Sequence, residues 1–164
     1  AEAEKAVQAR IDHLMGIKGK KSVDSIHKEL GHIMWEYVGM GRTEEGLKTA
    51  LKLLKDIRKE FETNLFIPGS TEGVNIELEK ALRLNDFITM GELIAYDALN
   101  RNESCGGHFR EEYQTEEGEA KRDDENYFYV SCWEYQGSDD VAPVLYKEPL
   151  VYEAIKVQTR NYKS

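Results

Sequence analysis

The spacing of apolar residues is the feature that most constrains the fold of this 164-residue chain. Over roughly the first hundred residues, apolar side chains recur every three or four positions, which is the period of a helix with one buried face. The first such stripe consists of Ala3, Val7, Ile11 and Leu14. After Asn126 the period changes to two, which is typical of a strand with two distinct faces. The pattern therefore predicts a mainly α fold with a small C-terminal β tail.

Start and stop signals divide the helical part into four predicted helices. Ser22 and Thr43 are suited to cap the second and third helices, and Gly39 is suited to end the second. Pro68 breaks the chain before a fourth helix, expected from about Gly73 to about Asn102. We expect an antiparallel three-helix bundle, similar to a spectrin repeat, with an extra N-terminal helix. The seams expected to be buried are Val23, Ile26, Leu30, Ile33 and Tyr37, then Leu47, Ala50, Leu54, Ile57 and Phe61, then Leu84, Phe87, Gly91, Ile94 and Ala98.

Alternation over Tyr127–Tyr135 predicts a strand, with Tyr127, Tyr129, Ser131, Trp133 and Tyr135 on one face. A turn is expected at 137–140, and short strands are expected at 144–146 and 150–157. Pro149 would mark a sheet edge or a junction. So few strands are marginally stable alone, so we expect the tail to pack on the bundle or on protein outside this sequence. The predicted domains are the bundle at 1–102, an acidic loop at 103–126 and the β tail at 127–164.

Composition excludes several classes of protein. The net charge of −9 argues against broad binding to nucleic acid. Cys105 and Cys132 fit no metal or redox spacing, which favours reduced thiols. No apolar run approaches the ~20 residues that span a bilayer, and the acidic, helical N-terminus does not resemble a signal peptide. Because the chain lacks an initial Met and begins inside a predicted helix, we expect it to be part of a longer protein.

Several motif-like stretches favour ordinary structural explanations. His27 and His32 are five residues apart, whereas a helical zinc pair needs a spacing of four. The run from Gly39 to Gly46 lacks the third glycine of a dinucleotide fingerprint and follows a helix, which favours a helix–helix turn. No phosphate-binding P-loop sequence and no nucleophile-elbow sequence is present in the chain.

Two groups of side chains could take part in catalysis, although a structural role is favoured for both. Glu92, Asp97 and Glu103 could act as paired carboxylates, but their spacing is that of a solvated helix face. Cys105 and His108 flank two glycines and could form a thiol–imidazole pair. A structural turn, in which His108 binds neighbouring backbone, is the favoured interpretation of this second group.

The segment NESCGGHFREEYQTEEGEAKRDDENY, which begins at Asn102, resembles the C-terminal signature of fumarate reductase and succinate dehydrogenase flavoprotein subunits. In that family a long helix ends in a stretch like R-x-E-S-R-G-x-H-x-R-x-D, followed by paired aspartates and an aromatic strand. The matching positions are Arg101, Glu103, Ser104, Gly106, His108 and Arg110, then Arg122, Asp123, Asp124 and Asn126. The turn Gly39–Arg42 also resembles a G-x-x-R turn in the family's helical domain.

The chain departs from the family pattern at three places. Cys105 replaces a common arginine, Glu112 replaces an aspartate, and the insertion YQTEEGEAK lengthens the loop. These departures suggest a long-loop bacterial branch. They leave open whether the parent enzyme reduces fumarate or oxidises succinate.

The resemblance implies an enzyme whose active site lies outside this chain. Such flavoproteins hold FAD in an upstream domain, and the cofactor performs the hydride chemistry. No flavin fingerprint or attachment motif occurs here, so we expect no catalytic, cofactor-binding or metal-binding residue in these 164 positions. The candidate domain-interface residues are Glu103, Ser104, Gly106, His108, Arg110, Arg122, Asp123 and Asp124. The expected partners are the upstream FAD and capping domains and an iron–sulfur subunit. We expect the parent enzyme to lie on the inner face of the bacterial cytoplasmic membrane, attached only indirectly through an anchor subunit.

Two other interpretations remain open at this point. The chain could be a freestanding helical interaction module that docks through Tyr127, Tyr129, Trp133 and Tyr135. A weaker alternative is a related flavoprotein such as an L-aspartate oxidase, although those proteins usually keep the arginine that Cys105 replaces and have a shorter acidic loop.

Overall fold

The computed structural model describes residues 2–137 and 141–158, and it divides into two compact units, Ala1–Leu99 and Asn100–Ser164. The first unit contains α1 (Glu2–Gly16), β1 (Lys21–Ser22), α2 (Val23–Val38), α3 (Glu44–Asn64), β2 (Leu65–Phe66) and nearly all of α4 (Ile76–Asn100). The second contains α5 (Asp124–Tyr127), β3 (Tyr129–Glu134) and β4 (Val144–Pro149). The mainly α class with a small C-terminal sheet is confirmed.

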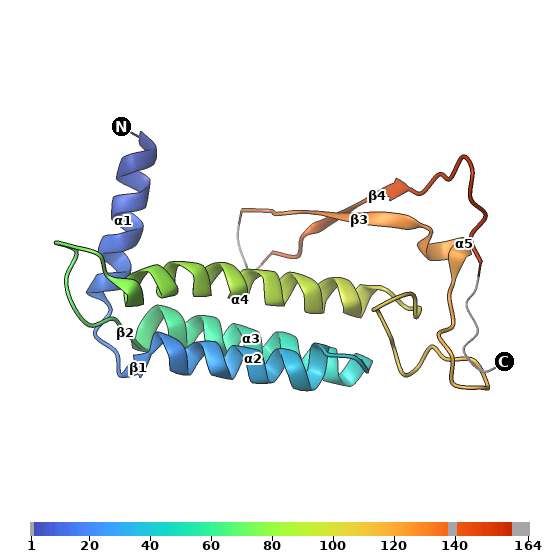
Figure 1. Cartoon of the computed structure of the whole chain (residues 1–164), viewed down its shortest axis with the longest axis horizontal. Coiled ribbons are helices and arrows are strands. Elements are labelled where there is room, and N and C mark those ends of the chain that lie inside the picture. Colours follow the sequence, from blue (N-terminus) through green and yellow to red (C-terminus); the bar gives the residue numbers. More distant parts are fainter. Residues whose placement is uncertain (1, 138–140, 159–164) are drawn as a thin grey trace. The chain divides into compact units, whose positions relative to one another are not determined.

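Helices α2, α3 and α4 lie side by side and alternate in direction (Figure 1). Their starts are capped by side chains that satisfy free backbone amides. Ser22 Oγ accepts from the Ser25 amide at 3.2 Å and Thr43 Oγ1 accepts from the Gly46 amide at 3.0 Å, so both predicted caps are confirmed. The start of α4 is set by Asn75, whose Oδ1 accepts from the Leu78 amide at 3.1 Å. The helix therefore begins three residues later than the sequence pattern suggested.

The core lies among the long helices of the first unit. The five seam residues predicted for α3 are all buried. In α2, Val23, Ile26 and Leu30 are buried, and Ile33 and Tyr37 pack against the core with partial exposure. In α1, Leu14 is buried and Ile11 packs against the core with partial exposure, whereas Ala3 and Val7 of the predicted stripe are exposed.

The predicted seam of α4 is wrong at two positions. Phe87 and Ile94 are 44% and 42% exposed, whereas Ile88 and Ala95 are fully buried. Two helical stripes fit the sequence, and they share three residues: Leu84, Gly91 and Ala98. Because α4 carries apolar residues on both stripes, periodicity alone could not choose between them.

Gly91 brings α4 close to its neighbours. A Cβ added there would lie 3.2 Å from Met34 Sδ, and 3.6 Å from Leu30 and from Leu54. These residues belong to α2 and α3. Three helices thus meet around a position with no side chain.

A short parallel ladder joins the start of α2 to the end of α3, and the sequence pattern did not predict it. Lys21 pairs with Leu65 and Ser22 pairs with Phe66. The Gly19 amide donates to the Leu65 carbonyl at 3.0 Å, and a Cβ on Gly19 would lie 1.9 Å from the Asn64 backbone. Only a residue without a side chain fits this close approach.

The second unit has a simpler sheet than predicted. Strands β3 and β4 form an antiparallel ribbon in which Tyr129 pairs with Pro149 and Glu134 with Val144. Pro149 ends β4, as expected of an edge, but residues 150–157 form no strand, so that prediction is wrong. Tyr127 belongs to α5 rather than to the strand. Of the turn expected at 137–140, only Gly137 is among the described residues.

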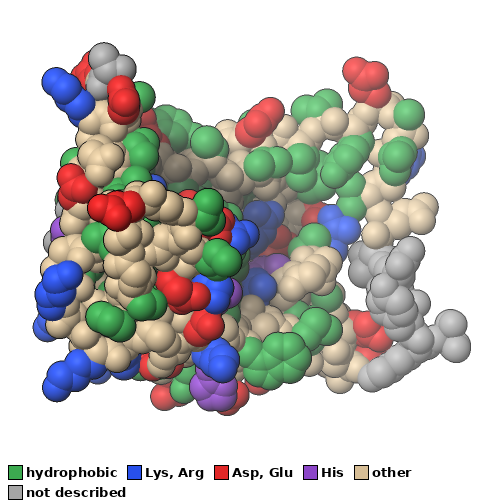
Figure 2. Space-filling model, turned by 60° about the vertical axis from the view of Figure 1, so that its left-hand side comes forward, with side chains coloured by type: hydrophobic (Ala, Val, Ile, Leu, Met, Phe, Trp, Pro, Cys, Tyr) green, Lys and Arg blue, Asp and Glu red, His purple; other side chains and the backbone are tan. Residues whose placement is uncertain are grey.

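The described surface carries mixed charge. Acidic and basic side chains lie among hydrophobic ones over the face shown in Figure 2. Within the described residues, every helix is too short or too polar to traverse a bilayer.

Candidate functional site

The candidate site is the signature segment, defined as residues 101–126, and it lies wholly within the second unit. It begins where α4 ends and continues into α5. Three of its side chains, Glu103, Ser104 and Arg110, are almost fully buried, with 2%, 0% and 1% exposure. Burying charged and polar groups to this extent is favourable only when they are paired or hydrogen-bonded.

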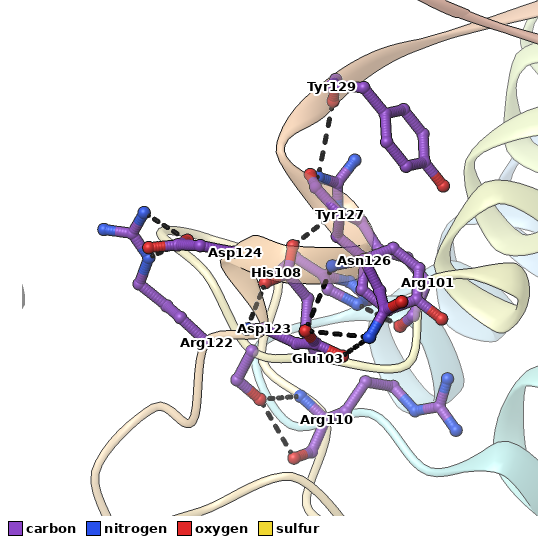
Figure 3. Close-up of polar contacts among 11 residues, drawn as sticks. Arg101, Glu103, His108, Arg110, Arg122, Asp123, Asp124, Asn126, Tyr127 and Tyr129 are labelled. Carbon is purple, nitrogen blue, oxygen red and sulfur yellow. Dashed lines mark hydrogen bonds and ion pairs between the residues drawn. The ribbon is translucent and has the colours of Figure 1, made fainter. Parts of the chain in front are cut away.

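Arg101 connects the start of this segment to the start of the ribbon (Figure 3). Its Nε donates to Glu103 Oε1 at 2.8 Å, and its Nη2 donates to the Tyr127 carbonyl. Its guanidinium carbon lies 5.7 Å from the centre of the Tyr127 ring and 5.3 Å from that of Tyr129. One side chain therefore makes an ion pair, hydrogen bonds to the Tyr127 and Tyr129 carbonyls and two cation–π contacts.

Glu103 bonds to Arg101 through one carboxylate oxygen and to the start of α5 through the other. Its second oxygen, Oε2, accepts from the Asp123 amide at 2.9 Å. Asp123 in turn caps α5, because its Oδ1 accepts from the Asn126 amide at 3.2 Å. The buried carboxylate therefore fixes the two ends of the signature segment against each other.

Ser104 and Arg110 are joined by reciprocal hydrogen bonds around a tight turn. The Arg110 amide donates to Ser104 Oγ at 2.8 Å, and Ser104 Oγ donates to the Arg110 carbonyl at 3.1 Å. Inside this pair, the backbones of Cys105 and His108 bond to each other at 2.8 and 3.1 Å. Gly106 lies at the turn with φ of 58°, a conformation that favours glycine.

The His108 ring binds a backbone carbonyl. Its Nε2 lies 2.9 Å from the Arg101 carbonyl oxygen (Figure 3). This contact is the one expected for a structural turn. It supports that interpretation over a catalytic Cys105–His108 pair.

The Arg110 side chain is held from its own segment. Its Nε donates to Glu112 Oε2 at 3.1 Å, and its guanidinium carbon lies 5.4 Å from the centre of the Tyr113 ring. Glu112, which replaces the family's aspartate, therefore still pairs with a signature arginine.

Arg122 and Asp124 form a more exposed pair. Arg122 Nε lies 3.0 Å from Asp124 Oδ1, and this contact is the main cause that raises the pKa of Arg122 above its usual value. Between the two halves of the signature, the inserted loop forms a small hairpin. Gln114 bridges to Ala120, and the Thr115 amide donates to the Glu119 carbonyl at 2.8 Å.

The turn Gly39–Arg42 in the first unit follows the end of α2, and an arginine side chain also bonds to backbone there. Arg42 Nε donates to the carbonyls of Val38 and Gly39, at 3.1 Å each. Burial lowers the pKa of Arg42, and the charge of Asp97 opposes this effect. A guanidinium thus satisfies carbonyls that the helix end leaves free.

The other candidate groups from the sequence do not form a site. His27 stacks on Phe87 with ring centres 5.5 Å apart, and His32 is exposed. Glu92 is paired with Arg58 at 2.6 Å, whereas Glu103 is paired with Arg101. Among the described residues no cluster of His, Cys, Asp or Glu could hold a metal ion.

The buried polar groups of the signature segment have hydrogen-bond partners within the protein. In the described part of the chain, every buried side-chain nitrogen or oxygen already has a hydrogen-bond partner. Glu103 and Ser104 direct their oxygen atoms to Arg101 and to backbone groups of the segment itself. Chemically, the arrangement holds a loop, a short helix and a ribbon in fixed register.

Three cation–π contacts were not predicted from the sequence. The sequence matched Arg101 to a family position, but its cation–π contacts depend on the tertiary positions of Tyr127 and Tyr129. Lys147 Nζ lies 4.4 Å from the centre of the same Tyr129 ring. Cross-strand register brings Lys147 there, and the sequence pattern alone does not fix the register of two strands.

Comparison with known proteins gives a consistent family. The family model described as the fumarate reductase flavoprotein C-terminus matches residues 27–162. The fumarate reductase flavoprotein subunit of Helicobacter pylori is 29% identical over 146 residues, covering 89% of this chain and 20% of that protein. L-aspartate oxidase 2-b of Nicotiana tabacum is 37% identical over 88 residues, covering 54% of this chain and 13% of that protein.

A solved quinol–fumarate reductase has the same fold, with a TM-score of 0.77 and 25% identity over 94% of this chain and 26% of that one. The chain spans about a fifth or less of the length of the curated relatives named above. The match to the family model covers most of the sequence. The chain therefore belongs to the family of fumarate reductase flavoprotein C-terminal domains.

Proposed function

We propose that this chain is the non-catalytic C-terminal part of an FAD-dependent flavoprotein subunit that interconverts fumarate and succinate. The parent subunit would exchange electrons with an iron–sulfur subunit and a quinone pool. The observation that carries the proposal is the family match over residues 27–162. The parent subunit is then the enzyme, and these residues form its scaffold.

The contacts of the signature segment support a scaffold role. Arg101 and Glu103 bond to each other and to backbone groups of the second unit, and Arg110 pairs with Glu112. Charge-assisted hydrogen bonds of this kind are strong and directional. We propose that the eight interface candidates, together with Arg101, maintain the shape of an edge on which the FAD-binding domain packs.

The intact subunit provides the test of this role. His108→Ala removes the contact to the Arg101 carbonyl. Arg110→Ala removes a buried cation and its ion pair with Glu112. Both variants should lower FAD content and thermal stability together. Arg83→Ala, which breaks an exposed pair with Glu79, is the matched control and should change neither. Normal FAD content and stability in both signature variants would refute the interface role.

A second candidate substrate is L-aspartate. It is favoured by the relative from Nicotiana tabacum, which is more identical than the Helicobacter protein but over a shorter stretch. Measuring fumarate-dependent oxidation of reduced viologen and aspartate-dependent oxygen consumption in the intact subunit separates the two. Activity with aspartate and none with fumarate would replace the main proposal.

The remaining assignments also belong to the proposal. The partners would be the upstream domains and the iron–sulfur subunit, and the location would be the inner face of the cytoplasmic membrane through an anchor subunit. A gene whose upstream frame encodes a dinucleotide fingerprint, beside an iron–sulfur protein gene, would support these assignments. A start codon just before Ala1 would instead favour the freestanding interaction module.

A further inference from the structure

The second unit has an unusual interior. From residue 100 to residue 158, the described residues bury Glu103, Ser104 and Arg110 and no apolar side chain. The described hydrophobic core runs from Leu14 to Ala98 and belongs to the first unit. A polar network alone contributes little net stability, since its groups exchange bonds with water for bonds within the protein. Its apolar side chains, such as Phe109, Phe128 and Trp133, are at most partly buried, so hydrophobic burial stabilises the second unit less than the first.

The two faces of the ribbon differ in exposure. Tyr129, Ser131, Trp133 and Leu145 are half-buried. The opposite side, which we name the outer ribbon face, consists of Val130, Cys132, Val144 and Tyr146, all exposed. Val130, Val144 and Tyr146 are 49%, 43% and 55% exposed. The face that the interaction-module hypothesis selected is thus mostly the half-buried one.

The outer ribbon face is arranged like the centre of an interface. Cys132 lies directly opposite Tyr146, in the middle of the patch. Glu134 and Glu148 lie on the same face, opposite Val144 and Val130. Tyr146 Oη donates to Glu134 Oε2 at 3.1 Å, which leaves the tyrosine ring as apolar surface beside a charged rim. Apolar centres with polar rims are typical of protein interfaces.

The edge of β4 is less suited to binding than this face. Lys147 and Glu148 put charge on β4, and Pro149 at its end has no amide to donate. Charges and proline are the usual protection of an edge strand against pairing with another chain. A partner on the β4 side of the ribbon would therefore cover side chains rather than pair with the free edge of β4.

The occupant must be present whenever the ribbon is folded. A two-stranded ribbon is marginal alone, so a transient partner would leave it unfolded for part of the time. A covering surface on the same polypeptide is always at high effective concentration. The Helicobacter relative is about five times as long as the matched region, which leaves ample chain for this cover.

We infer that the outer ribbon face is covered by the portion of the flavoprotein chain outside these 164 residues, through an apolar surface with Lys or Arg opposite Glu134 and Glu148. This inference rests on the proposed function, because it requires a longer parent subunit. It adds to that function by identifying the residues of one intramolecular interface. The contact is hydrophobic at its centre and charge-complementary at its rim.

Cys132 supplies a probe at the centre of the face. The full-length flavoprotein, purified without other subunits, is treated with a maleimide, and the labelling rate of the Cys132 peptide is followed by mass spectrometry. Burial limits access to a thiol, so the native rate should be at least about tenfold below that of the same peptide in guanidinium. Val130→Glu should restore rapid labelling, and the matched control Val7→Glu, on exposed α1, should not.

The rim is tested separately. Glu148→Lys should raise the Cys132 labelling rate several-fold at low salt, because it opposes like charges, whereas Glu148→Gln should have a smaller effect. Equal effects of the two substitutions would refute the basic rim.

Three results would overturn the inference. The first is labelling of Cys132 in the folded full-length protein at the denatured rate. The second is full protection in the 164-residue chain alone, with its helical content verified by circular dichroism, since the cover would then be internal. The third is protection that appears only when an iron–sulfur subunit is added. Fumarate turnover of the same preparation separates the proposals: free labelling with turnover refutes this inference alone, and protection without turnover refutes the proposed substrate alone.

Discussion

Ser104 and Arg110 are linked by two hydrogen bonds that share one hydroxyl oxygen, which accepts from the Arg110 amide at 2.8 Å and donates to its carbonyl at 3.1 Å. A single buried hydroxyl thus bonds to both the amide and the carbonyl of the Arg110 backbone. The order of the signature segment depends on such contacts because no apolar side chain is buried among its described residues.

Ser104→Ala should selectively destabilise the second unit. It removes the hydroxyl to which the buried Arg110 amide donates, which costs about 1–3 kcal/mol, whereas the Arg110 carbonyl keeps its hydrogen bond from the Tyr113 amide at 2.8 Å. Hydrogen exchange with mass spectrometry should show faster exchange in peptides around 103–111, with α2 and α3 unchanged. Ser70→Ala, at an exposed loop, is the control. Unchanged protection of the 103–111 peptides would contradict the role assigned to this hydroxyl.

Glu103→Gln should weaken the connection between Arg101 and α5. The substitution removes the charge of a 2%-exposed carboxylate that pairs with Arg101 and accepts from the Asp123 amide. We expect a loss of about 2–3 kcal/mol in the second unit. A double-mutant cycle with Arg101→Gln measures the coupling. Glu79→Gln, in an exposed pair with Arg83, should cost less than about 1 kcal/mol; equal effects of the two glutamate substitutions would contradict the prediction.

Gly19→Ala should destabilise the first unit, because the new Cβ would lie 1.9 Å from the Asn64 backbone and force the β1–β2 ladder apart. We expect the free energy of unfolding, measured by urea denaturation, to fall by about 1–3 kcal/mol. Gly31→Ala in α2 is the matched control. Its Cβ would meet nothing within 4 Å, so it should stabilise the helix by up to about 1 kcal/mol. Tolerance of Gly19→Ala would show that the ladder is not close-packed.

The pH dependence of stability should depend on Glu60. Hydrogen bonds from Asn64 and Lys21 lower the pKa of Glu60 below its usual 4.5. A lowered carboxyl pKa contributes stability that is present above the unfolded pKa and is lost as the pH falls through the folded pKa. Urea midpoints between pH 2 and 7 should therefore fall less steeply for Glu60→Gln than for the parent chain. The exposed residue Glu36, changed to Gln, is the comparison, and identical slopes for all three proteins would refute this contribution.

Much of the helical unit could be predicted from the sequence. The buried stripe of α3 follows directly from the helical spacing of its apolar residues. The caps Ser22 and Thr43 depend on residues next to the helix start, so the sequence predicted both features. The stripe of α4 was ambiguous because Phe87 and Ile88 each continue a helical pattern, and only packing against α2 and α3 decides between them. The β1–β2 ladder joins residues more than forty positions apart, which local patterns do not reveal.

The candidate site was predicted in its members but not in its contacts. Glu103, Ser104, His108 and Arg110 were chosen by resemblance, and the structure brings them together around one turn. Their partners are largely backbone groups, which carry no sequence signal. The assignment to a long-loop branch and the interface role of these residues stay predictions.

The most direct test of the central claim uses the purified 164-residue chain beside its full-length parent. Both are incubated with FAD, passed through a desalting column and assayed for bound flavin absorbance and for fumarate-dependent oxidation of reduced viologen. A scaffold predicts flavin and turnover in the parent and neither in the 164-residue chain. Retained flavin or measurable turnover in the 164-residue chain would contradict the claim that the redox site lies outside it.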